Sequence, residues 1–501
     1  MYPLGAVLAT PRLRSVLRLL PTIVAIVFVL TAYVFFGSNG KWEFRRVHWY
    51  TVPYDAPGAG YYASLTEGFR RGQLSLAHSP DPRLLAVKNP YDAFQREVAG
   101  THYLWDASLY RGRYFLYFSP LPAFLFYWPY RIVGRDYPQD FLAAVVFSAW
   151  TFVMAAAFAR RALARRKLFV PLPLWILLIG FGNVIVFLLP HIRTYEVAIL
   201  CGSAMTATWA YSLLRFLESG TRKHAFWMGV WLALSICARP NLGVLLLVAA
   251  IAILTLRDRR LIVRAALAAL IPLSVVGLLM IAYNLRRFGH PLEFGIKYQL
   301  TFVDMARFRV CGLCSLPEAV RVVNGAVQYV FWGPSVGSEF PFVDIQRSRL
   351  DPKVSFPSGA EQIVGIGALV PLTLLGSFFA LILLRSKETA VRAGLLVMAA
   401  AWLALFGLAA CWWVTARYAM DFMVLMTLAA AICVEAGLTF LASTGVSIRP
   451  LRVLAIVLAL YSIGVGFFAG FNGTDWAFSR NNPELFKKLH DRIGTQPKPE
   501  K

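Results

Sequence analysis

Charged side chains stand at the borders of long apolar stretches, in segments that lie far apart in the chain. The set comprises Asp55, Asp81, Asp92, Asp106, Glu196, Arg193, Arg239, Arg286, Arg287, Lys297, Arg417 and Asp421. A charge near the hydrocarbon boundary of a membrane is costly unless it faces a cavity or a partner. Carboxylates can transfer protons, and guanidinium groups can hold phosphate oxygens. Acids and bases on one face of a membrane therefore indicate a functional site. The alternative for each residue is an ion pair that only orients helices, such as Arg417 with Asp421 or Arg193 with Glu196.

Several other catalytic motifs are missing from the sequence. It contains no Walker loop, no GxGxxG after a strand, no GxSxG and no HExxH, so nucleotide hydrolysis and zinc proteolysis are unsupported. Cys311 and Cys314 form a CxxC motif without a nearby histidine. Outside the cytoplasm this spacing favours a small structural disulfide over a metal site.

The composition indicates a membrane protein. The chain has 501 residues, of which 58% are hydrophobic and 15% are charged, whereas soluble domains carry about 25% charged residues. Its mean hydropathy is +0.59. The net charge of +24 would suggest nucleic acid binding in a soluble protein. Here we attribute much of it to membrane topology and the rest to an anionic lipid-linked ligand or membrane surface, and we expect no nucleic acid partner and no cleavable signal peptide.

Apolar stretches predict an all-α polytopic bundle. Spans of about 17–25 apolar residues cross a bilayer as helices. Eleven candidates occur, at about 18–36, 140–159, 169–189, 195–214, 225–238, 241–256, 265–284, 362–384, 393–414, 419–441 and 453–471. Together they predict a transmembrane domain over residues 1–471, followed by a polar extracytoplasmic tail over residues 472–501, of which Asn481–Lys501 is predicted to be loosely ordered.

Basic residues fall in every second break between these stretches. The clusters lie at 12–18, 160–167, 215–223, 257–264, 385–392 and 449–452. Since Lys and Arg are held on the cytoplasmic side, the N-terminus is predicted to be cytoplasmic and the C-terminus extracytoplasmic. The aromatic and proline-rich stretch 114–133 is predicted to lie along the interface, because a crossing there would place the cluster at 160–167 outside. A twelfth crossing is the alternative.

Two large extracytoplasmic loops follow from this topology, at about 37–139 and 285–361. Long loops within a compact architecture are usually functional. In the first loop, Tyr62, Leu65 and Phe69 recur at helical spacing, while Arg70 and Arg71 fall on another face. This pattern predicts an amphipathic helix over residues 61–76 on the membrane surface.

The order of several short motifs resembles the GT-C superfamily of polytopic glycosyltransferases, which includes aminoarabinose transferases and protein O-mannosyltransferases. The motifs are Asp55 followed by GYYASL at 60–65 and GQL at 72–74, NPYD at 89–92, WDASLY at 105–110, GRYFLYFSPLP at 112–122, HIRTYE at 191–196, ARPN at 238–241 and YNLRRFG at 283–289. Similar motifs occur in bacterial members. The typical Asp-Glu pair is absent, because Ala56 follows Asp55, so either Asp55 or Asp106 could be the working carboxylate.

The resemblance implies a GT-C-like bundle of about eleven helices in the bacterial inner (plasma) membrane, with interfacial helices in the first outer loop. It implies an inverting hexosyl- or pentosyltransferase that uses a polyprenyl-phosphate sugar donor and a lipid, glycan or protein acceptor. No cofactor is expected, and a divalent cation is left open. The implied catalytic residues are Asp55, Asp106 and Glu196, and the implied substrate-binding residues are Tyr62, Asp92, Arg193, Arg239, Arg286, Lys297 and Arg417.

Two further functions compete with this prediction. One is a transporter or flippase of lipid-linked substrates, and the other is an inactive relative that serves as a scaffold. A transporter is disfavoured because the sequence shows no inverted repeat. Its charges are also expected at mid-depth in the membrane, whereas those of this chain lie at the outer boundaries.

Overall fold

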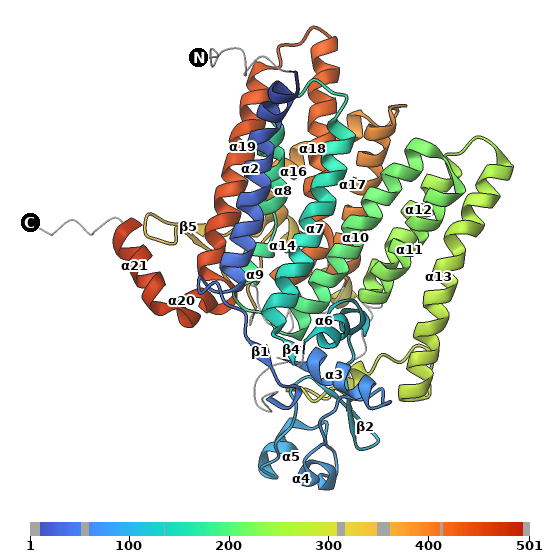
Figure 1. Ribbon diagram of the computed structural model, residues 1–501, viewed down its shortest axis with the longest axis vertical. Coiled ribbons are helices and arrows are strands. Elements are labelled where there is room, and N and C mark those ends of the chain that lie inside the picture. The colour runs from blue at the N-terminus through green and yellow to red at the C-terminus, as the bar shows by residue number, and fades with distance from the viewer. Residues whose placement is uncertain are drawn as a thin grey trace, which may run out of the picture.

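The computed structural model is a bundle of long helices with loops and short elements gathered at one end (Figure 1). It describes residues 11–51, 60–134, 136–307, 316–347, 361–410 and 414–493. Asp55, Cys311 and Cys314 lie outside the described residues, so the structure does not test the predictions made for them.

Seven helical segments in the described part of the chain are long and apolar enough to cross a membrane. They contain α2 (Pro11–Gly37), α7 (Asp140–Leu163), α10 (Thr194–Ser219), α13 (Arg259–Phe288), α17 (Thr389–Ala409), α18 (Met420–Ser443) and α19 (Arg449–Asn472). The all-helical membrane class is therefore confirmed.

The remaining predicted spans form shorter helices. These are α8 (Leu172–Phe181) with α9 (Ile185–Leu188), α11 (Arg222–Ala238), α12 (Leu245–Leu254), and α15 (Ile366–Leu369) with α16 (Leu372–Ile382). Pro240 opens the 3-10 turn η3 (Pro240–Val244) between α11 and α12, and Pro371 precedes α16. Proline lacks the N–H that continues a helix, so these stretches are interrupted and the predicted count of eleven spans is not established.

The basic clusters in the described residues lie at one end of the bundle, which we call the basic end (Figure 1). Arg160 and Arg161 stand in the last turn of α7, while α13 and α19 begin at Arg259 and Arg449. The opposite end, which we call the loop end, carries the long connections. The assignment of the basic end to the cytoplasm remains a prediction from charge.

The first long connection folds into short elements at the loop end. Two antiparallel pairs join β1 (Arg46–Val47) to β4 (Tyr137–Pro138) and β2 (Ser108–Tyr110) to β3 (Arg113–Phe115). Between them lie η1 (Trp49–Thr51), α3 (Tyr61–Arg70), α4 (Pro82–Ala86), α5 (Ala93–Val98), the π-helix η2 (Ala123–Tyr127) and α6 (Trp128–Val133). The stretch 114–133 therefore contains no helix of spanning length.

The amphipathic helix predicted over residues 61–76 is shorter and more buried than expected. It ends at Arg70 as α3, and Tyr61–Gly68 are buried within the protein. Phe69 stacks on Phe124 of η2 with ring centroids 5.0 Å apart. The helix therefore lies between other elements of the loop end rather than presenting one apolar face to a membrane surface.

The second long connection and the C-terminal segment also lie at the loop end. They contain η4 (Ile296–Tyr298), η5 (Met305–Arg307), α14 (Leu316–Phe331), β5 (Ser335–Val336) paired with β6 (Val343–Asp344), η8 (Thr474–Trp476), α20 (Ala477–Asn481) and α21 (Pro483–Ile493). Phe486 of α21 packs on Phe340 with ring centroids 5.3 Å apart. The described part of the tail is thus helical and packed, where the sequence predicted loose order.

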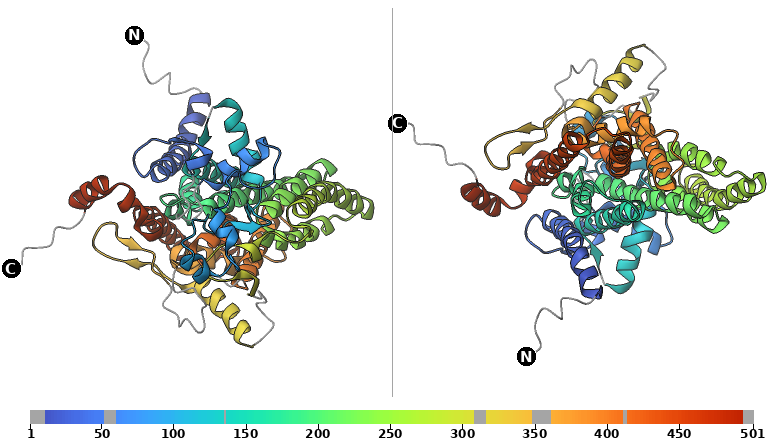
Figure 2. Two further views of the ribbon diagram at one scale, coloured as in Figure 1. Left: turned by 90° about the horizontal axis from the view of Figure 1, so that it is seen from below. Right: turned by 90° about the horizontal axis from the view of Figure 1, so that it is seen from above.

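Helix α10 forms the centre of the bundle and α13 its edge. In the most apolar 18-residue stretch of α10, 94% of the residues are buried within the protein, whereas the corresponding share in α13 is 22%. Figure 2 shows α11, α12 and α13 extending from one side of the bundle, with β5, β6 and α21 on the other. Small residues permit close helix contacts of the kind common in membranes. A Cβ added to Gly466 in α19 would lie 1.8 Å from the carbonyl oxygen of Phe181 in α8.

Candidate active site

Asp106 stands in the turn before β2 in a left-handed backbone conformation, with φ of 61°. Aspartate tolerates this conformation better than most residues. The Asp106 N–H donates to the carbonyl of Leu300 at 3.0 Å, which fixes the turn against the second long connection. The Asp106 carboxylate accepts a hydrogen bond from the hydroxyl of Tyr195 in the first turn of α10.

Burial raises the pKa of the Asp106 carboxyl above its ordinary value. The hydrogen bond from Tyr195 and the charges of Arg417 and Arg193 act in the opposite direction, since they favour the ionised form. A general base works best when its pKa lies near the operating pH. The environment of Asp106 therefore shifts a carboxylate in the direction that suits proton abstraction.

The start of α10 places Glu196 and Arg193 beside this turn. The Glu196 carboxylate accepts the backbone N–H of Arg193 at 2.9 Å and is 2% exposed. Arg193 precedes the helix with extended backbone angles, so its side chain does not lie one helical turn below Glu196. Its guanidinium forms no ion pair with any residue that the structure describes.

Arg417 lies in the 3-10 turn η7 (Ala416–Ala419), which leads into α18. Its Nη2 forms an ion pair with Oε1 of Glu361 at 2.8 Å, and its Nη1 lies 4.0 Å from Oε1 of Glu196. The guanidinium also lies over the Tyr195 ring, 5.0 Å from the centroid. The alternative pairing of Arg417 with Asp421 is wrong, because η7 is not an α-helical turn and Glu361 takes the cation.

These residues line a small cavity at the loop end, with a volume of about 180 Å³. Its polar lining comprises His191, Arg193, Glu196, Glu361, Arg417 and Asp475, with Gln362, Thr415 and Thr474. Burial, together with the charge of Arg193, lowers the pKa of His191 to about 4. The cavity therefore presents two arginines, several carboxylates and a neutral imidazole.

Sequence reasoning missed Glu361 and gave no role to His191 and Tyr195. Both His191 and Tyr195 belong to the HIRTYE motif, so their proximity to Glu196 was the available signal. Glu361 directly precedes the apolar stretch that begins at 362. Its position at the border of an apolar stretch is the same sequence feature that identified Glu196 as a candidate.

Arg239 lies apart from this cavity in a buried ion pair. Its Nη2 and Nε donate to Oδ2 of Asp421 at 2.8 and 3.2 Å, and the Asn241 amide donates to the same oxygen at 2.8 Å. Arg239 packs against Gly202 of α10, where an added Cβ would lie 2.5 Å from its Cγ. The Arg239 guanidinium lies over the ring of Tyr418, 5.2 Å from the centroid. Since Tyr418 directly follows Arg417 in η7, this ring separates Arg239 from the residues of the cavity.

Four other predicted substrate-binding residues do not line the cavity. Tyr62 is fully buried and donates to the carbonyl of Ser119 at 3.2 Å. Asp92 caps α5 by accepting the N–H of Phe94 at 3.0 Å. Lys297 pairs with Glu293 at 2.9 Å.

The fourth, Arg286, is exposed on α13, whereas its neighbour Arg287 is buried. Arg287 donates to the carbonyl of Leu116 at 2.7 Å and to the Asn284 amide oxygen at 2.8 Å. One position along a helix rotates a side chain by about 100°, so the two adjacent arginines meet different surroundings. Arg287 joins α13 to the loop end.

Within the described residues no three histidine, cysteine, aspartate or glutamate side chains are placed to hold a metal ion. Glu196 and Glu361 both approach Arg417. The described part of the cavity therefore offers carboxylates that are paired with Arg417.

Comparisons with known proteins return solved structures alone. No family model and no curated protein matches the chain. The oligosaccharyltransferase of Archaeoglobus fulgidus resembles it in the apo form (13% identity, TM-score 0.48, 95% of this chain and 60% of that chain). The same enzyme with an inhibitory peptide and a dolichol-phosphate gives 14% identity, a TM-score of 0.47 and the same coverage. Its complex with Zn and sulfate gives 14% identity, a TM-score of 0.48, and coverage of 95% of this chain and 58% of that chain.

The described helices define a polytopic membrane protein. This chain spans about 60% of the length of the archaeal oligosaccharyltransferase. A likeness of this degree carries no argument about the fold, substrate or catalytic residues of this chain.

Proposed function

We propose that this protein is a membrane glycosyltransferase that moves a sugar from a polyprenyl-phosphate donor to an acceptor hydroxyl at the loop end of the bundle. The observation that carries the proposal is the meeting of Arg193 and Arg417 with Glu196 and Glu361 in one cavity. Asp106 is joined to that cavity through Tyr195, whose ring lies against Arg417. The sequence motifs that resemble GT-C enzymes support the same function.

The transfer is a displacement at the anomeric carbon. The acceptor oxygen forms a bond to that carbon, while the bond from the carbon to the phosphate oxygen breaks and its electron pair stays on the phosphate. The acceptor proton passes to a carboxylate. Attack opposite the leaving group inverts the anomeric centre, and the products are a glycoside and the polyprenyl phosphate.

Arg193 and Arg417 are the residues that we assign to the leaving phosphate. Arg193 has no carboxylate partner among the described residues. In Arg417 one nitrogen is held by Glu361, while Nη1 lies 4.0 Å from Glu196 and the buried Nε has no hydrogen-bond partner in the described structure. Guanidinium groups match phosphate oxygens in geometry and charge, so these nitrogens can take up the charge that develops on the phosphate.

Asp106 is the general base that the geometry favours. Its hydrogen bond to Tyr195, whose chain neighbour Glu196 lines the cavity, holds the carboxylate in a fixed position. Asp55 remains a proposed alternative, since it lies outside the described residues. Glu196 is assigned to holding Arg417 and the start of α10 rather than to proton transfer, because its carboxylate already accepts the N–H of Arg193.

The orientation in the cell forms part of the proposal. The basic end faces the cytoplasm of a bacterium and the loop end faces outward, so the described end of the chain at Ile493 is extracytoplasmic. This orientation follows from the positions of the arginine clusters. It also places the cavity on the side where an envelope acceptor is available.

Binding of a polyprenyl phosphate without sugar tests the phosphate assignment, because this lipid is the proposed product. The probe is undecaprenyl phosphate, titrated against purified protein in detergent. Lysine keeps the charge of arginine but loses its fork. Arg417→Lys and Arg193→Lys should each weaken binding by about 10- to 100-fold, the scale of a charge-assisted hydrogen bond.

Arg286→Lys is the matched control, because Arg286 is an exposed arginine at the same end of the bundle. Its affinity for undecaprenyl phosphate should equal that of the native protein. Equal affinities in all three variants, or no binding of the lipid by the native protein, would overturn the proposed function.

A further inference from the structure

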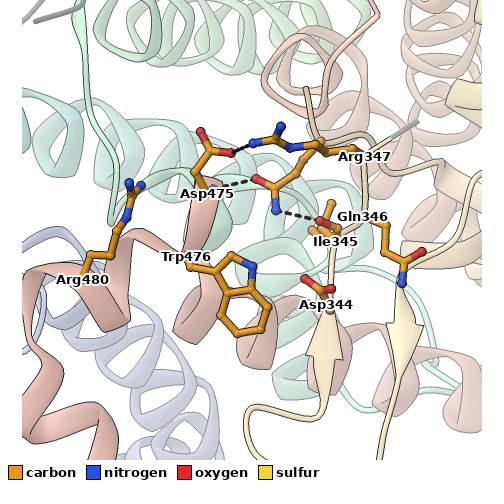
Figure 3. A pocket seen from close by; sticks show the side chains of 8 residues that line it. Asp344, Ile345, Gln346, Arg347, Asp475, Trp476 and Arg480 are labelled. Carbon is orange, nitrogen blue, oxygen red and sulfur yellow. Dashed lines mark hydrogen bonds and ion pairs between the residues drawn. The ribbon is translucent and has the colours of Figure 1, made fainter. Parts of the chain in front are cut away.

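A second, larger cavity opens at the loop end beside the first. Its volume is about 610 Å³, within the range of about 300–1,000 Å³ that small-molecule sites occupy. It lies between the β5–β6 hairpin with the residues that follow it and the corner where α19 leads through η8 into α20 (Figure 3). Gln362 and Asp475 line both cavities, so the two spaces are neighbours.

The corner between α19 and α20 has a strained backbone. Asp475 and Trp476 both adopt left-handed conformations, with φ of 52° and 59°. Aspartate tolerates this region, but a bulky residue such as Trp476 is an outlier there, at a cost of about 1–3 kcal/mol. Strain of this kind is concentrated at ligand clamps and active sites. The strained backbone at this corner holds Trp476 at the cavity.

The Trp476 ring is available for contact with a ligand. It is 44% exposed and borders the cavity together with Arg480 and Asp344 (Figure 3). Tryptophan combines a large apolar face with low conformational entropy, and it usually buries much of that face. The exposed face of Trp476 can therefore contact a ligand that enters the cavity.

The polar side chains around the ring hold one another in place, and their charges balance. Arg347 pairs with Asp475 at 3.0 Å. The Gln362 amide donates to the carbonyl of Ile345 at 2.7 Å and its oxygen accepts the N–H of Asp475 at 2.7 Å. With Asp344 and Arg480 added, the lining carries two acids and two bases. This balance disfavours a ligand of strong single charge.

We propose that this cavity binds an uncharged glycan, with a sugar ring stacked on Trp476 and its hydroxyl groups bound by Asp344, Gln346 and Arg480. The C–H face of a sugar ring is apolar and suits an indole, while its hydroxyls both donate and accept hydrogen bonds. Planar polar side chains around one aromatic surface match both properties. That the glycan is the sugar acceptor rests on the proposed function, since Gln362 and Asp475 connect this cavity to the one with Arg193 and Arg417.

The test is binding of the purified protein in detergent to an array of neutral hexose oligosaccharides. Trp476→Gly removes the ring and places glycine where the left-handed backbone favours it. This variant should lose affinity for the bound oligosaccharides by about tenfold or more, and its melting temperature should not fall. Trp476→Phe, which keeps an aromatic face, should retain part of the affinity.

Trp227→Ala is the matched control, because Trp227 is 45% exposed but lies in α11 near the basic end. It should bind the array as the native protein does. Absence of oligosaccharide binding by the native protein, or equal binding by Trp476→Gly, would overturn the inference, and a large loss of melting temperature in Trp476→Gly would assign the residue to structure instead.

The two proposals fail separately. Trp476→Gly should bind undecaprenyl phosphate as tightly as the native protein, while Arg417→Lys should bind the oligosaccharides normally. If the lipid phosphate does not bind but the glycan does, the transferase proposal fails and the glycan site stands. The reverse result removes the glycan site alone.

Discussion

The hydroxyl of Tyr195 donates a hydrogen bond to the carboxylate of Asp106, and this contact joins residues 89 positions apart in the chain. It connects the first turn of the central helix α10 to the turn that precedes β2. The base that we assign is therefore oriented by a residue of the bundle rather than by its own loop.

Asp106→Asn should fold but lose transfer by a factor of ~100 or more, the usual scale of acid–base catalysis. Transfer is measured from a panel of polyprenyl-phosphate hexoses to membrane acceptors. Asp92→Asn is the control in the same connection, because asparagine also caps a helix. Full activity of Asp106→Asn with loss in Asp55→Asn would move the assignment to Asp55.

The pH dependence of transfer should report the environment of Asp106. The base acts only when ionised, and burial raises its pKa, so the rate should fall with decreasing pH at a higher pH than an ordinary aspartate, with a pKa of about 3.9, would give. Tyr195→Phe removes a hydrogen bond that favours the ionised form. The acid limb should then shift to still higher pH, while an unchanged limb would contradict the role of Tyr195.

The buried pair of Arg239 with Asp421 should be a large contribution to folding. Arg239→Met leaves the Asp421 carboxylate buried without its cation, which costs about 3–5 kcal/mol. The side chains of this pair are 10% and 0% exposed, whereas those of Lys297 and Glu293 are 49% and 14% exposed. Lys297→Met should therefore cost less than about 1 kcal/mol. Unfolding of both variants in detergent checks the difference, and equal losses would contradict it.

Two glycines of α19 allow a matched test of helix packing. A Cβ at Gly466 would meet the Phe181 carbonyl at 1.8 Å, while one at Gly464 would meet nothing within 4 Å. Gly466→Ala should destabilise the protein by about 1–3 kcal/mol through overpacking. Gly464→Ala should be neutral or stabilising by up to about 1 kcal/mol. Thermal unfolding of the two variants should separate them, and the same shift in both would refute the close contact.

Membrane orientation can be read from single cysteines. Ala164→Cys, at the basic end, should react with an impermeant maleimide only after the cells are permeabilised. Val98→Cys, which is 71% exposed in the native residue, should react in intact cells. Labelling above that of the parent chain is the measure, and labelling of position 164 in intact cells would reverse the topology.

Much of the helical layout could be predicted from the sequence, because apolar length and arginine position are one-dimensional signals. Each of the eleven predicted stretches contains helix, although Pro371 interrupts the stretch 362–384 and Pro240 lies between two short ones. The burial of α3 could not be predicted, since amphipathic spacing shows which residues share a face and leaves open what covers it.

The pairing of charges could not be predicted for a different reason. Spacing left open the alternative that Arg417 pairs with Asp421 and Arg193 with Glu196, as neighbours on one helix. In the structure Arg417 lies in a 3-10 turn and Arg193 precedes its helix, so neither shares an α-helical face with its expected partner. The actual partner of Arg417, Glu361, comes from a distant segment, and such contacts leave no trace in local spacing.

The cavity draws its lining from Phe187 to Asp475, and Asp106, from earlier in the chain, accepts a hydrogen bond from Tyr195, the neighbour of the lining residue Glu196. During synthesis, the ribosome must therefore deliver the last helix to the membrane before any complete site exists. Nascent chains that end before Glu361 hold Asp106, Arg193 and Glu196 without Glu361 and Arg417, and chains that end before η8 still lack Thr474 and Asp475. Premature termination would thus yield inert protein rather than an unregulated enzyme.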